Sequence, residues 1–433
     1  MKTRSTVAGI NFEEASFKNF ENIEGYDMYA RAGIFNEYLN FLDQRGHLNY
    51  RMEAISGCGP EMEVLLPGQS IPQTMVGLVS NDYLGFTQHP KVKAAVIEAV
   101  QQYGTGAGAS PAIGGHFNFH QRLEEKIARF FKRDSAILYT TGYTANSATF
   151  QCLLQKEDIA ILDMAVHASV FEGCQLTNIK RFPHNNLEML ELVLKQTKGK
   201  YRNRMVIIDG VYSQDGDLAP LDKILELTKS YGAFLAIDDA HGTGVIGRTG
   251  RGVLELYDLF DQVDLITGTF SKTFAHVGGY IVGNPELIRF LKFQSRQHLF
   301  SATSSPAAAG IIKAIELVDE EPHWQSRLWD NIEYFKKGLI ELGFDVGNTQ
   351  SAIIPVKIGD PRKTGEAGRL LLDYGVYSNP IIYPAVSKND ARIRMSLMAT
   401  HTRQQLDKTL NAFADVDGKI GITNQASGSH LFT

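Results

Sequence analysis

Short, continuously apolar runs alternate with helical stretches along the middle of the chain, and this alternation limits the possible folds more than any other feature. The runs are AILYTT at Ala136, IAILD at Ile159, MVIID at Met205, FLAID at Phe234, DLITGTF at Asp264 and YIVG at Tyr280. Strands that are apolar on both sides belong to mainly parallel sheets covered by helices on both faces. Ligands of such sheets bind at the carboxyl ends of the strands, so we expect functional residues directly after these runs.

The regions beside the alternating segment predict further helices and a second, smaller domain. Apolar residues recur at helical spacing from Pro90 to Tyr103 and from Gln121 to Arg133. A long helical pattern at 311–342 precedes two more apolar runs, AIIPVKI at Ala352 and ARIRMSL at Ala391. We therefore predict an α/β protein with an N-terminal segment at 1–75, a large, mainly parallel sheet domain at 76–310, a smaller C-terminal α+β domain at 311–417 and a disordered tail at 418–433.

Charge, cysteine usage and hydropathy narrow the functional classes. The formal net charge is −5, from 48 acidic and 43 basic residues without a long run of either sign, so we expect no nucleic-acid partner. Cys58, Cys152 and Cys174 contain no C-x-x-C pair, which predicts a reducing, cytoplasmic location and no zinc site. No apolar stretch is long enough to span a bilayer. Membrane contact is at most peripheral, through GIFNEYLNFL at Gly33, for which packing or dimer contact is the preferred interpretation.

A carboxylate and a lysine follow two successive apolar runs. Asp238 ends the run FLAID and is followed by His241, whereas Lys272 follows DLITGTF among small, uncharged neighbours. A lysine that forms a Schiff base must lose its proton, and a dry pocket favours this by lowering the lysine pKa. Pyridoxal phosphate needs such a lysine and also an anion beside its ring nitrogen. Lys272 and Asp238 together therefore predict a pyridoxal-phosphate site.

The same edge offers groups for the phosphate and for the ring of this cofactor. The run AILYTT turns through Gly142 and Tyr143 into a predicted helix, and backbone amides at a helix N-terminus bind phosphate. Thr269 and Ser271 offer hydroxyl groups beside the lysine. His167 follows the run IAILD, where its imidazole could stack on the cofactor ring, although a lone histidine is more often structural.

Two other motifs favour structural roles. GTGAGA at Gly104 resembles a dinucleotide-binding loop, but that loop requires a strand before it, and here a helix is predicted. His116 and His120 have the spacing of metal ligands, but no glutamate lies between them and no third ligand lies nearby. We therefore expect neither a nicotinamide site nor a metal site, and we assign the histidines to helix entry and packing.

Several motifs occur in the same order as in a known enzyme family. They are SNDYLGF at Ser80, TGYTAN at Thr141, HAS at His167, DGVYSQDGD at Asp209, DDAHGTGVIG at Asp238, GTFSK at Gly268 and RIRMSLMATHT at Arg392. With this set the chain resembles the α-oxoamine synthases, which are pyridoxal 5'-phosphate enzymes of fold type I. Members of that family condense an amino acid with an acyl-CoA and release CO₂. The resemblance covers residues 81–413.

The resemblance implies a role for each matching residue. Lys272 would carry the cofactor and act as general base, Asp238 would contact the ring nitrogen, His241 the ring hydroxyl, and His167 would stack on the ring. The remaining cofactor contacts would be Gly142, Tyr143, Ser213, Thr269, Ser271 and Thr303. Arg394 would bind the substrate carboxylate, with Asn81 as a second substrate contact. The family forms homodimers with active sites at the interface, so Thr303 would reach the phosphate of the partner.

The substrates are predicted less sharply than the reaction class. TGTFSK, SNPIIYPAV and SLMATHT are most similar to serine palmitoyltransferases, whereas SAIIPVKIGD is also similar to 2-amino-3-ketobutyrate CoA ligases. We expect an acyltransferase that joins serine, or a serine-like amino acid such as cysteate, to a long-chain acyl-CoA in sphingolipid or sulfonolipid synthesis. Glycine C-acetyltransferase and 8-amino-7-oxononanoate synthase are the alternatives within the family. Aldol cleavage or transamination, and a catalytically silent partner subunit, are the rivals outside it, although silent subunits typically lack the lysine.

Overall fold

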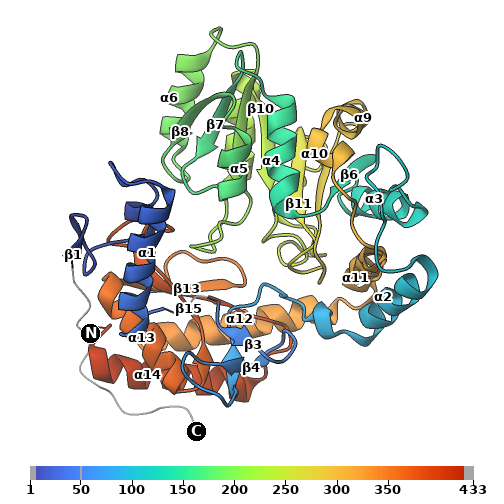
Figure 1. Cartoon of the computed structure of the whole chain (residues 1–433). Coiled ribbons are helices and arrows are strands. Elements are labelled where there is room, and N and C mark those ends of the chain that lie inside the picture. The colour runs from blue at the N-terminus through green and yellow to red at the C-terminus, as the bar shows by residue number, and fades with distance from the viewer. Residues whose placement is uncertain (1–5, 49–50, 424–433) are drawn as a thin grey trace.

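A seven-stranded sheet forms the core of the upper part of the molecule in Figure 1, in the strand order β6-β12-β11-β10-β9-β7-β8. Its strands are β6 (Ser135–Tyr139), β7 (Ile159–Asp163), β8 (Asn178–Phe182), β9 (Arg204–Asp209), β10 (Phe234–Asp238), β11 (Leu265–Thr269) and β12 (Gly279–Gly283). This computed structural model describes residues 6–48 and 51–423. Each of the six apolar runs predicted between residues 136 and 283 forms one of these strands. Strand β8 is additional, because its sequence NIKRF contains no apolar run.

The sheet is mainly parallel, as predicted. Strands β11, β10, β9, β7 and β8 pair in parallel, while β12 pairs antiparallel with both β11 and β6. Side chains alternate between the two faces, so that Leu235 and Ile237 of β10 enter one core cluster and Ala236 enters another. Because both faces are buried, the strand sequences are apolar throughout instead of alternating with polar residues.

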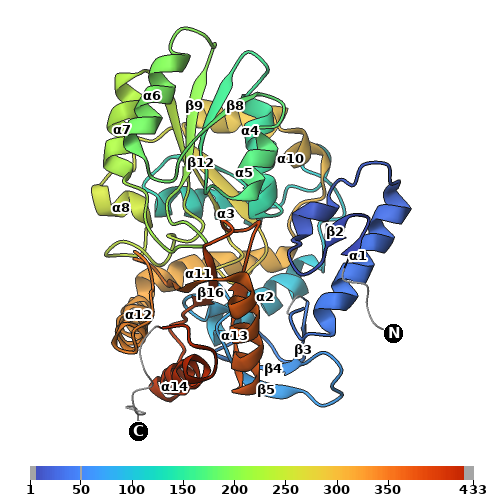
Figure 2. The same cartoon turned by 90° about the vertical axis from the view of Figure 1, so that its left-hand side faces the viewer.

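Helices cover both faces of this sheet. Figure 2 shows α6 and α7 on one side and α4 and α5 on the other, and the core clusters place α3 with the first pair and α9 with the second. The helices of this part are α2 (Pro90–Tyr103), α3 (Asn118–Phe130), α4 (Gly142–Leu153), α5 (Ala168–Gly173), α6 (Leu187–Thr197), α7 (Leu221–Ser230), α8 (Val253–Tyr257), α9 (Pro285–Gln294) and α10 (Arg296–Phe300). The α3 helix begins before its predicted start, because the His120 side chain accepts a hydrogen bond from the Phe117 amide and caps it.

A smaller α+β region follows in the C-terminal part of the chain, as predicted. Its antiparallel sheet has the order β13-β16-β15. The elements are α11 (Ala309–Glu320), α12 (His323–Glu341), β13 (Ile353–Gly359), α13 (Pro361–Asp373), β14 (Val376–Tyr377), β15 (Asn379–Ile381), β16 (Ala391–Ser396) and α14 (Arg403–Ile420). The predicted helical stretch at 311–342 is two helices, because Pro322 lies between them and cannot continue the first.

The N-terminal segment joins the C-terminal part of the fold. Strands β3 (Glu53–Ala54), β4 (Glu61–Leu65) and β5 (Gln73–Gly77) form a sheet with β14, in the order β14-β5-β4-β3. Helix α1 (Met28–Asp43) follows a short hairpin, β1 (Thr6–Val7) with β2 (Ile10–Asn11). The amphipathic segment at Gly33 lies in α1 and buries Ile34, Tyr38 and Phe41 with Phe12 and Phe20. The boundary placed at residue 75 stays a prediction.

Two other expectations concern the tail and membranes. Helix α14 ends at Ile420, so the predicted tail begins within its last turn, and residues 424–433 lie outside the described residues. Among the residues that the structure describes, no helix is both long and apolar enough to cross a membrane.

Candidate active site

The carboxyl ends of the central strands line a cavity of about 250 Å³. Asp209 and Asp238 end the neighbouring strands β9 and β10 and are directly paired in register. Strand β11 ends at Thr269, shortly before Lys272. Eight of the predicted site residues line this one cavity, namely Lys272, Asp238, His241, His167, Gly142, Tyr143, Thr269 and Ser271. The parallel strands thus bring together residues that are far apart in the sequence.

Lys272 has the reactivity that a cofactor-carrying lysine needs. Burial lowers its pKa from 10.5 to about 8, even though the nearby Asp238 carboxylate opposes the shift. Arg394 adds positive charge nearby and lowers the pKa further. A larger fraction of Lys272 is therefore neutral near physiological pH than for an ordinary lysine.

Asp238 is held by an asparagine that sequence reasoning did not single out. Asn146 Nδ2 donates to Asp238 Oδ2 at 2.6 Å and also to Ser169 Oγ at 3.0 Å. The Ala240 amide donates to the other Asp238 oxygen at 3.0 Å. Asn146 is 3% exposed, and its Oδ1 atom has no partner in the described structure. Its place in TANSATF, inside the first turns of α4, was the available signal.

His167 is oriented by the same network. It caps α5, and its Nδ1 accepts the Ser169 amide hydrogen at 3.3 Å and lies 2.8 Å from Ser169 Oγ. Because Nδ1 is an acceptor, the neutral ring carries its proton on Nε2. Burial lowers the pKa of His167, and this shift exceeds the opposing effect of Asp238. One amide, Asn146, therefore connects Asp238 and His167 through Ser169.

His241 is an uncharged histidine at the same edge. Its Nδ1 lies 2.6 Å from the hydroxyl of Tyr83, a residue in SNDYLGF that sequence reasoning did not assign. Burial holds the pKa of His241 well below its usual value, and the nearby cations Lys272 and Arg394 lower it further. Burial also raises the pKa of Tyr83 to about 12. The neutral ring can therefore exchange hydrogen bonds with a ligand hydroxyl without carrying a charge.

Asp209, like Asn146 and Tyr83, is a residue of the site that sequence reasoning did not single out, although it ends an apolar run. Burial raises its pKa well above the usual value, and the neighbouring Asp238 carboxylate raises it further. The His167 amide contacts its Oδ1 at 3.4 Å. Burial and the neighbouring carboxylate therefore both favour the protonated form of Asp209.

The N-terminus of α4 provides an anion cradle. A side chain at Gly142 would place its Cβ 2.6 Å from the Thr269 Cβ, so only glycine allows the two segments to approach this closely. Thr269 Oγ1 lies 2.7 Å from Ser271 Oγ, and the first amides of α4 are those of Gly142 and Tyr143, while the Thr144 amide donates to the Thr141 hydroxyl. Helix N-termini attract phosphate through such amides. Tyr143 also contacts the His167 ring edge to face, with ring centroids 6.0 Å apart.

The predicted substrate residues lie beside the cavity. Arg394 of β16 is 7% exposed, and its Nη2 donates to Asn81 Oδ1 at 3.2 Å. Its Nε donates to the Ser213 carbonyl at 2.6 Å. Ser213 therefore contacts Arg394 through its backbone and is not among the residues that line the cavity. Burial lowers the pKa of Arg394, but an arginine stays charged.

Thr303 is the predicted residue that lies away from this cavity. Its amide and hydroxyl donate to the carbonyls of Ala109, at 3.4 Å, and Gly115, at 2.9 Å. Its expected contact with the phosphate of a partner subunit stays a prediction. The structural role expected for His120 agrees with its contacts, since it caps α3 and its Nε2 lies 3.1 Å from the Ser304 carbonyl.

The residues present fit pyridoxal phosphate. The unpaired Asn146 Oδ1 and the close approach of Gly142 to Thr269 mark a polar cavity that ends in a helix N-terminus. Lys272, with its lowered pKa, would supply the amine that bonds the cofactor carbonyl, and Asp238 would supply the anion for the ring nitrogen. A parallel sheet with this set at its carboxyl edge defines a pyridoxal-phosphate enzyme of fold type I.

Comparisons with known proteins agree with this class. The model of the aminotransferase class I and II family matches residues 73–413. An 8-amino-7-oxononanoate synthase from Alkaliphilus metalliredigens is 41% identical over 84% of this chain and 92% of its own length. The Bacillus subtilis 8-amino-7-oxononanoate synthase 1 is 41% identical over 78% of this chain and 87% of its own length.

Solved structures give a second set of relatives. A variant of serine palmitoyltransferase from S. paucimobilis with a bound PLP–myriocin aldimine is 31% identical, has a TM-score of 0.86, and matches 92% of this chain and 100% of its own. The Sphingomonas wittichii serine palmitoyltransferase is 30% identical with the same TM-score and coverage. The chain therefore belongs to the α-oxoamine synthases, pyridoxal-phosphate-dependent acyltransferases within the class I and II aminotransferase family.

The comparisons refine the expected substrates. Likeness to serine palmitoyltransferase is confirmed at the level of structure. The curated relatives at about 40% identity, however, carry the name of an alternative weighed from the sequence, 8-amino-7-oxononanoate synthase. That alternative is better supported than the serine palmitoyltransferase prediction.

Proposed function

We propose that this enzyme condenses L-alanine with a seven-carbon dicarboxylic acyl-CoA to give 8-amino-7-oxononanoate, CoA and CO₂. The observation that carries the proposal is the full site set, with Lys272 and Asp238 in one cavity, in a chain that is 41% identical to enzymes of that name. The name describes a nine-carbon acid with a ketone at C7 and an amine at C8. Decarboxylative condensation therefore takes C8 and C9 from alanine and C1 to C7 from the acyl group.

The chain's own residues have distinct tasks in this reaction. Bound pyridoxal phosphate supplies an electron sink for the α-carbon of the amino acid. Lys272 Nζ takes the α-proton, for which a pKa of about 8 is suited. Asp238 would serve as the anion for the ring nitrogen, and Asn146 fixes the direction of its carboxylate. A bond from the alanine α-carbon to the acyl carbon forms as the CoA thiolate leaves, the bond to the carboxylate then breaks with release of CO₂, and a proton returns to the α-carbon from Lys272.

Recognition of the amino acid falls to the small α+β region. Arg394 offers its guanidinium to the substrate carboxylate, a geometry that arginine matches with two parallel hydrogen bonds. Asn81 holds one side of this guanidinium and the Ser213 carbonyl holds another. His167 and Asp238 border the cavity in which the ring would lie, and the neutral His241 serves the ring hydroxyl.

Serine or cysteate with a long-chain acyl-CoA is the second candidate. It is supported by the closer structural match, a TM-score of 0.86 over 92% of the chain for serine palmitoyltransferase. The Francisella tularensis 8-amino-7-oxononanoate synthase structure has a TM-score of 0.67 over 78% of the chain, and its 21% identity supports the fold alone. Both candidates share the reaction type and differ in the side chain and in the acyl group.

A substrate matrix decides between them. Purified holoenzyme is given alanine, serine, glycine or cysteate, each with pimeloyl-, palmitoyl- or acetyl-CoA, and free thiol and CO₂ are measured. We expect thiol and CO₂ in equal amounts, fastest with alanine and pimeloyl-CoA. Preference for serine or cysteate with palmitoyl-CoA would favour the second candidate. No thiol release with any pair would overturn the acyltransferase proposal in favour of a silent subunit or another pyridoxal-phosphate reaction.

We also propose a homodimer with shared active sites. In the single chain, α1 exposes two large apolar side chains, Met28 at 65% and Tyr29 at 78%. Mixed dimers test the sharing, because a Lys272→Ala chain and a Thr303→Ala chain would together restore one intact site if Thr303 serves the partner. Recovery of part of the activity on mixing supports the proposal, and no recovery from chains that exchange freely contradicts it.

A further inference from the structure

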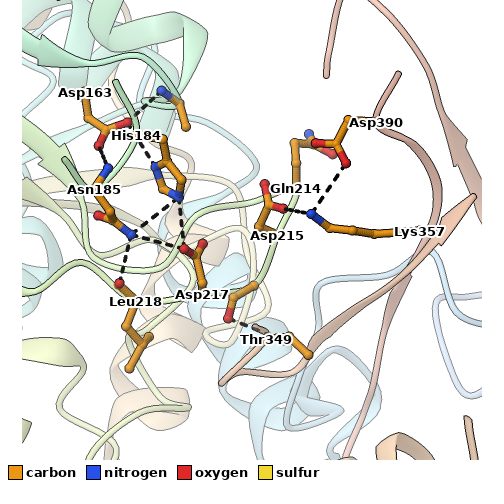
Figure 3. Close-up of polar contacts among 12 residues, drawn as sticks. Asp163, His184, Asn185, Gln214, Asp215, Asp217, Leu218, Thr349, Lys357 and Asp390 are labelled. Carbon is orange, nitrogen blue, oxygen red and sulfur yellow. Dashed lines mark hydrogen bonds and ion pairs between the residues drawn. The ribbon is translucent and has the colours of Figure 1, made fainter. Parts of the chain in front are cut away.

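A short hairpin, residues 211–218, leaves β9 directly after Asp209 and lies between the large sheet and the small α+β region. Val211 and Leu218 form an antiparallel bridge, and the Tyr212 amide donates to the Asp217 carbonyl at 3.1 Å. The side chains around it form two polar clusters (Figure 3), one from the large sheet and one from the small region. We call this segment the 211–218 hairpin.

On the side of the large sheet, His184 holds the hairpin. His184 follows β8, and its two ring nitrogens contact different carboxylates, Nδ1 with Asp163 at 3.2 Å and Nε2 with Asp217 at 2.9 Å (Figure 3). Asp163 ends β7 and is fully buried, whereas Asp217 belongs to the hairpin. Both nitrogens must donate, so the ring is an imidazolium. The pKa agrees, because hydrogen bonds to the two carboxylates overcome the effect of burial and raise it to about 10.

Asn185 adds neutral contacts to the same junction. Its amide donates to the second Asp163 oxygen at 2.8 Å, and its side chain donates to Asp217 at 3.1 Å and to the Leu218 carbonyl at 3.2 Å. The backbone at Asn185 has a φ of 53°, a left-handed conformation that asparagine tolerates better than most residues. The hairpin is therefore attached to the ends of β7 and β8 through its second strand, at Asp217 and Leu218.

On the opposite side, cations of the small region hold the tip of the hairpin. Asp215 pairs with Arg392 at 2.5 Å and with Lys357 at 3.3 Å, and Lys357 also pairs with Asp390 at 3.4 Å. Arg392 is fully buried and donates to the Gln214 carbonyl at 3.1 Å. Ser213 directly precedes this tip, and its carbonyl accepts from Arg394 Nε at 2.6 Å.

We propose that His184 is a positioning residue for amino-acid recognition, because the imidazolium clamped between Asp163 and Asp217 fixes the 211–218 hairpin that orients Arg394. Without the cation, two carboxylates face each other across the junction and repel, one of them fully buried. The hairpin then shifts, and with it the Ser213 carbonyl that sets the direction of the guanidinium. This inference rests on the proposed role of Arg394 in binding the substrate carboxylate.

The test compares His184→Gln and Asp217→Asn with His323→Gln, an exposed histidine at the start of α12. The dissociation constant of the amino acid is read from the absorbance change of the holoenzyme, without an acyl donor, so it does not depend on which acyl group is correct. We expect His184→Gln to weaken amino-acid binding about tenfold. Asp217→Asn should weaken it less, since His184 keeps its pair with Asp163 and no two carboxylates are left facing each other. The KM for the acyl thioester and the constants of His323→Gln should stay within about twofold of wild type.

A double variant separates positioning from general loss of structure. If His184 acts through Arg394, His184→Gln has little further effect in an Arg394→Lys background, where the forked guanidinium is already gone. An undiminished tenfold effect in that background overturns the inference, and so does unchanged amino-acid binding in both single variants. If His184→Gln proves unstable, the effect of Asp217→Asn on amino-acid binding is compared in the wild-type and Arg394→Lys backgrounds instead. If the wild-type enzyme binds an amino acid but releases no thiol with any acyl-CoA, that result would count against the proposed function and not against the role of His184.

Discussion

Two histidines at the same edge of one sheet differ in charge, since His241 is neutral and His184 is positive. His241 faces the Tyr83 hydroxyl and lies near Lys272 and Arg394, so burial and neighbouring cations keep its pKa well below the usual value. His184 faces two carboxylates, which raise its pKa to about 10. Burial lowers the pKa of both rings, and the partners decide the charge. The edge is thereby divided into a cavity with neutral or reactive groups and a neighbouring junction held by fixed charges.

This division separates chemistry from positioning. In the cavity, Lys272 is driven toward its neutral, nucleophilic form, and Asp209 toward its protonated form. At the junction, His184 stays charged and ties the 211–218 hairpin to the sheet. The comparison teaches that a shifted pKa alone does not mark a catalytic residue, since both regions contain one.

Removal of Lys272 should have the largest effect. Lys272→Ala eliminates both the cofactor bond and the general base, so we expect turnover to fall at least about 10³-fold. The turnover rate is measured by the release of the CoA thiol. Lys195→Ala, in an exposed pair with Glu191 on α6, is the matched control and should leave turnover unchanged. Equal rates for the two variants would show that Lys272 lies outside the chemistry.

The pH dependence of cofactor capture should show the lowered pKa of Lys272. The neutral amine is the reactive form, so with a pKa of about 8 the capture rate by protein stripped of cofactor should rise about fiftyfold between pH 6 and pH 8 and level off above. Stopped-flow absorbance follows the reaction. A rate that continues to rise tenfold per pH unit through pH 9 would indicate a lysine with an ordinary pKa. The cavity would then not differ from the His184 junction in favouring a neutral, reactive group.

Asn146 should contribute less than the groups it orients. Asn146→Ala removes a hydrogen bond from the buried Asp238 and another from Ser169, which corresponds to about tenfold weaker cofactor binding. Equilibrium dialysis of pyridoxal phosphate measures this affinity. Asn178→Ala, at the start of the edge strand β8, serves as the control. Unchanged affinity in Asn146→Ala would mean that Asp238 is held well enough by the Ala240 amide.

The smallest expected effect is a pH-dependent change in stability at His184. The folded-state pKa of about 10 lies above the ordinary value of 6.5, so the charged junction stabilises the fold fully below pH 6.5 and loses this contribution as pH rises through 10. The unfolding temperature of His184→Gln should therefore lie about 2–4 °C below that of wild type at pH 6, with the gap narrowing toward pH 10. A gap that widens with pH would show that His184 is neutral.

The sequence was sufficient for six of the seven strands of the sheet and for eight residues of the cavity. Buried parallel strands are apolar throughout, and chemistry follows at their carboxyl ends, so Lys272, Asp238 and His167 could be found from their places after such runs. Strand β8 escaped prediction because it lies at the edge of the sheet and carries polar residues. The sheet that joins β14 to β5 was also not predictable, since its strands are short and come from opposite ends of the chain.

Residues that act through other residues could not be predicted. Asn146 lies in a helical segment without unusual composition, and only the structure shows that its amide joins Asp238 to Ser169. His184 and Asp217 are 33 positions apart, and their contact depends on the path of the hairpin. Such pairs are set by tertiary packing, for which a single sequence contains no local signal.

Identification of the lysine that bonds the cofactor is the most direct test of the proposed site. Holoenzyme is reduced with sodium borohydride, digested, and the peptide that carries the pyridoxyl group is sequenced by mass spectrometry. We predict one modified peptide, with the label on Lys272. A label on any other lysine, or no label in protein saturated with pyridoxal phosphate, would contradict the assignment of the cavity at the ends of β9, β10 and β11 as the active site.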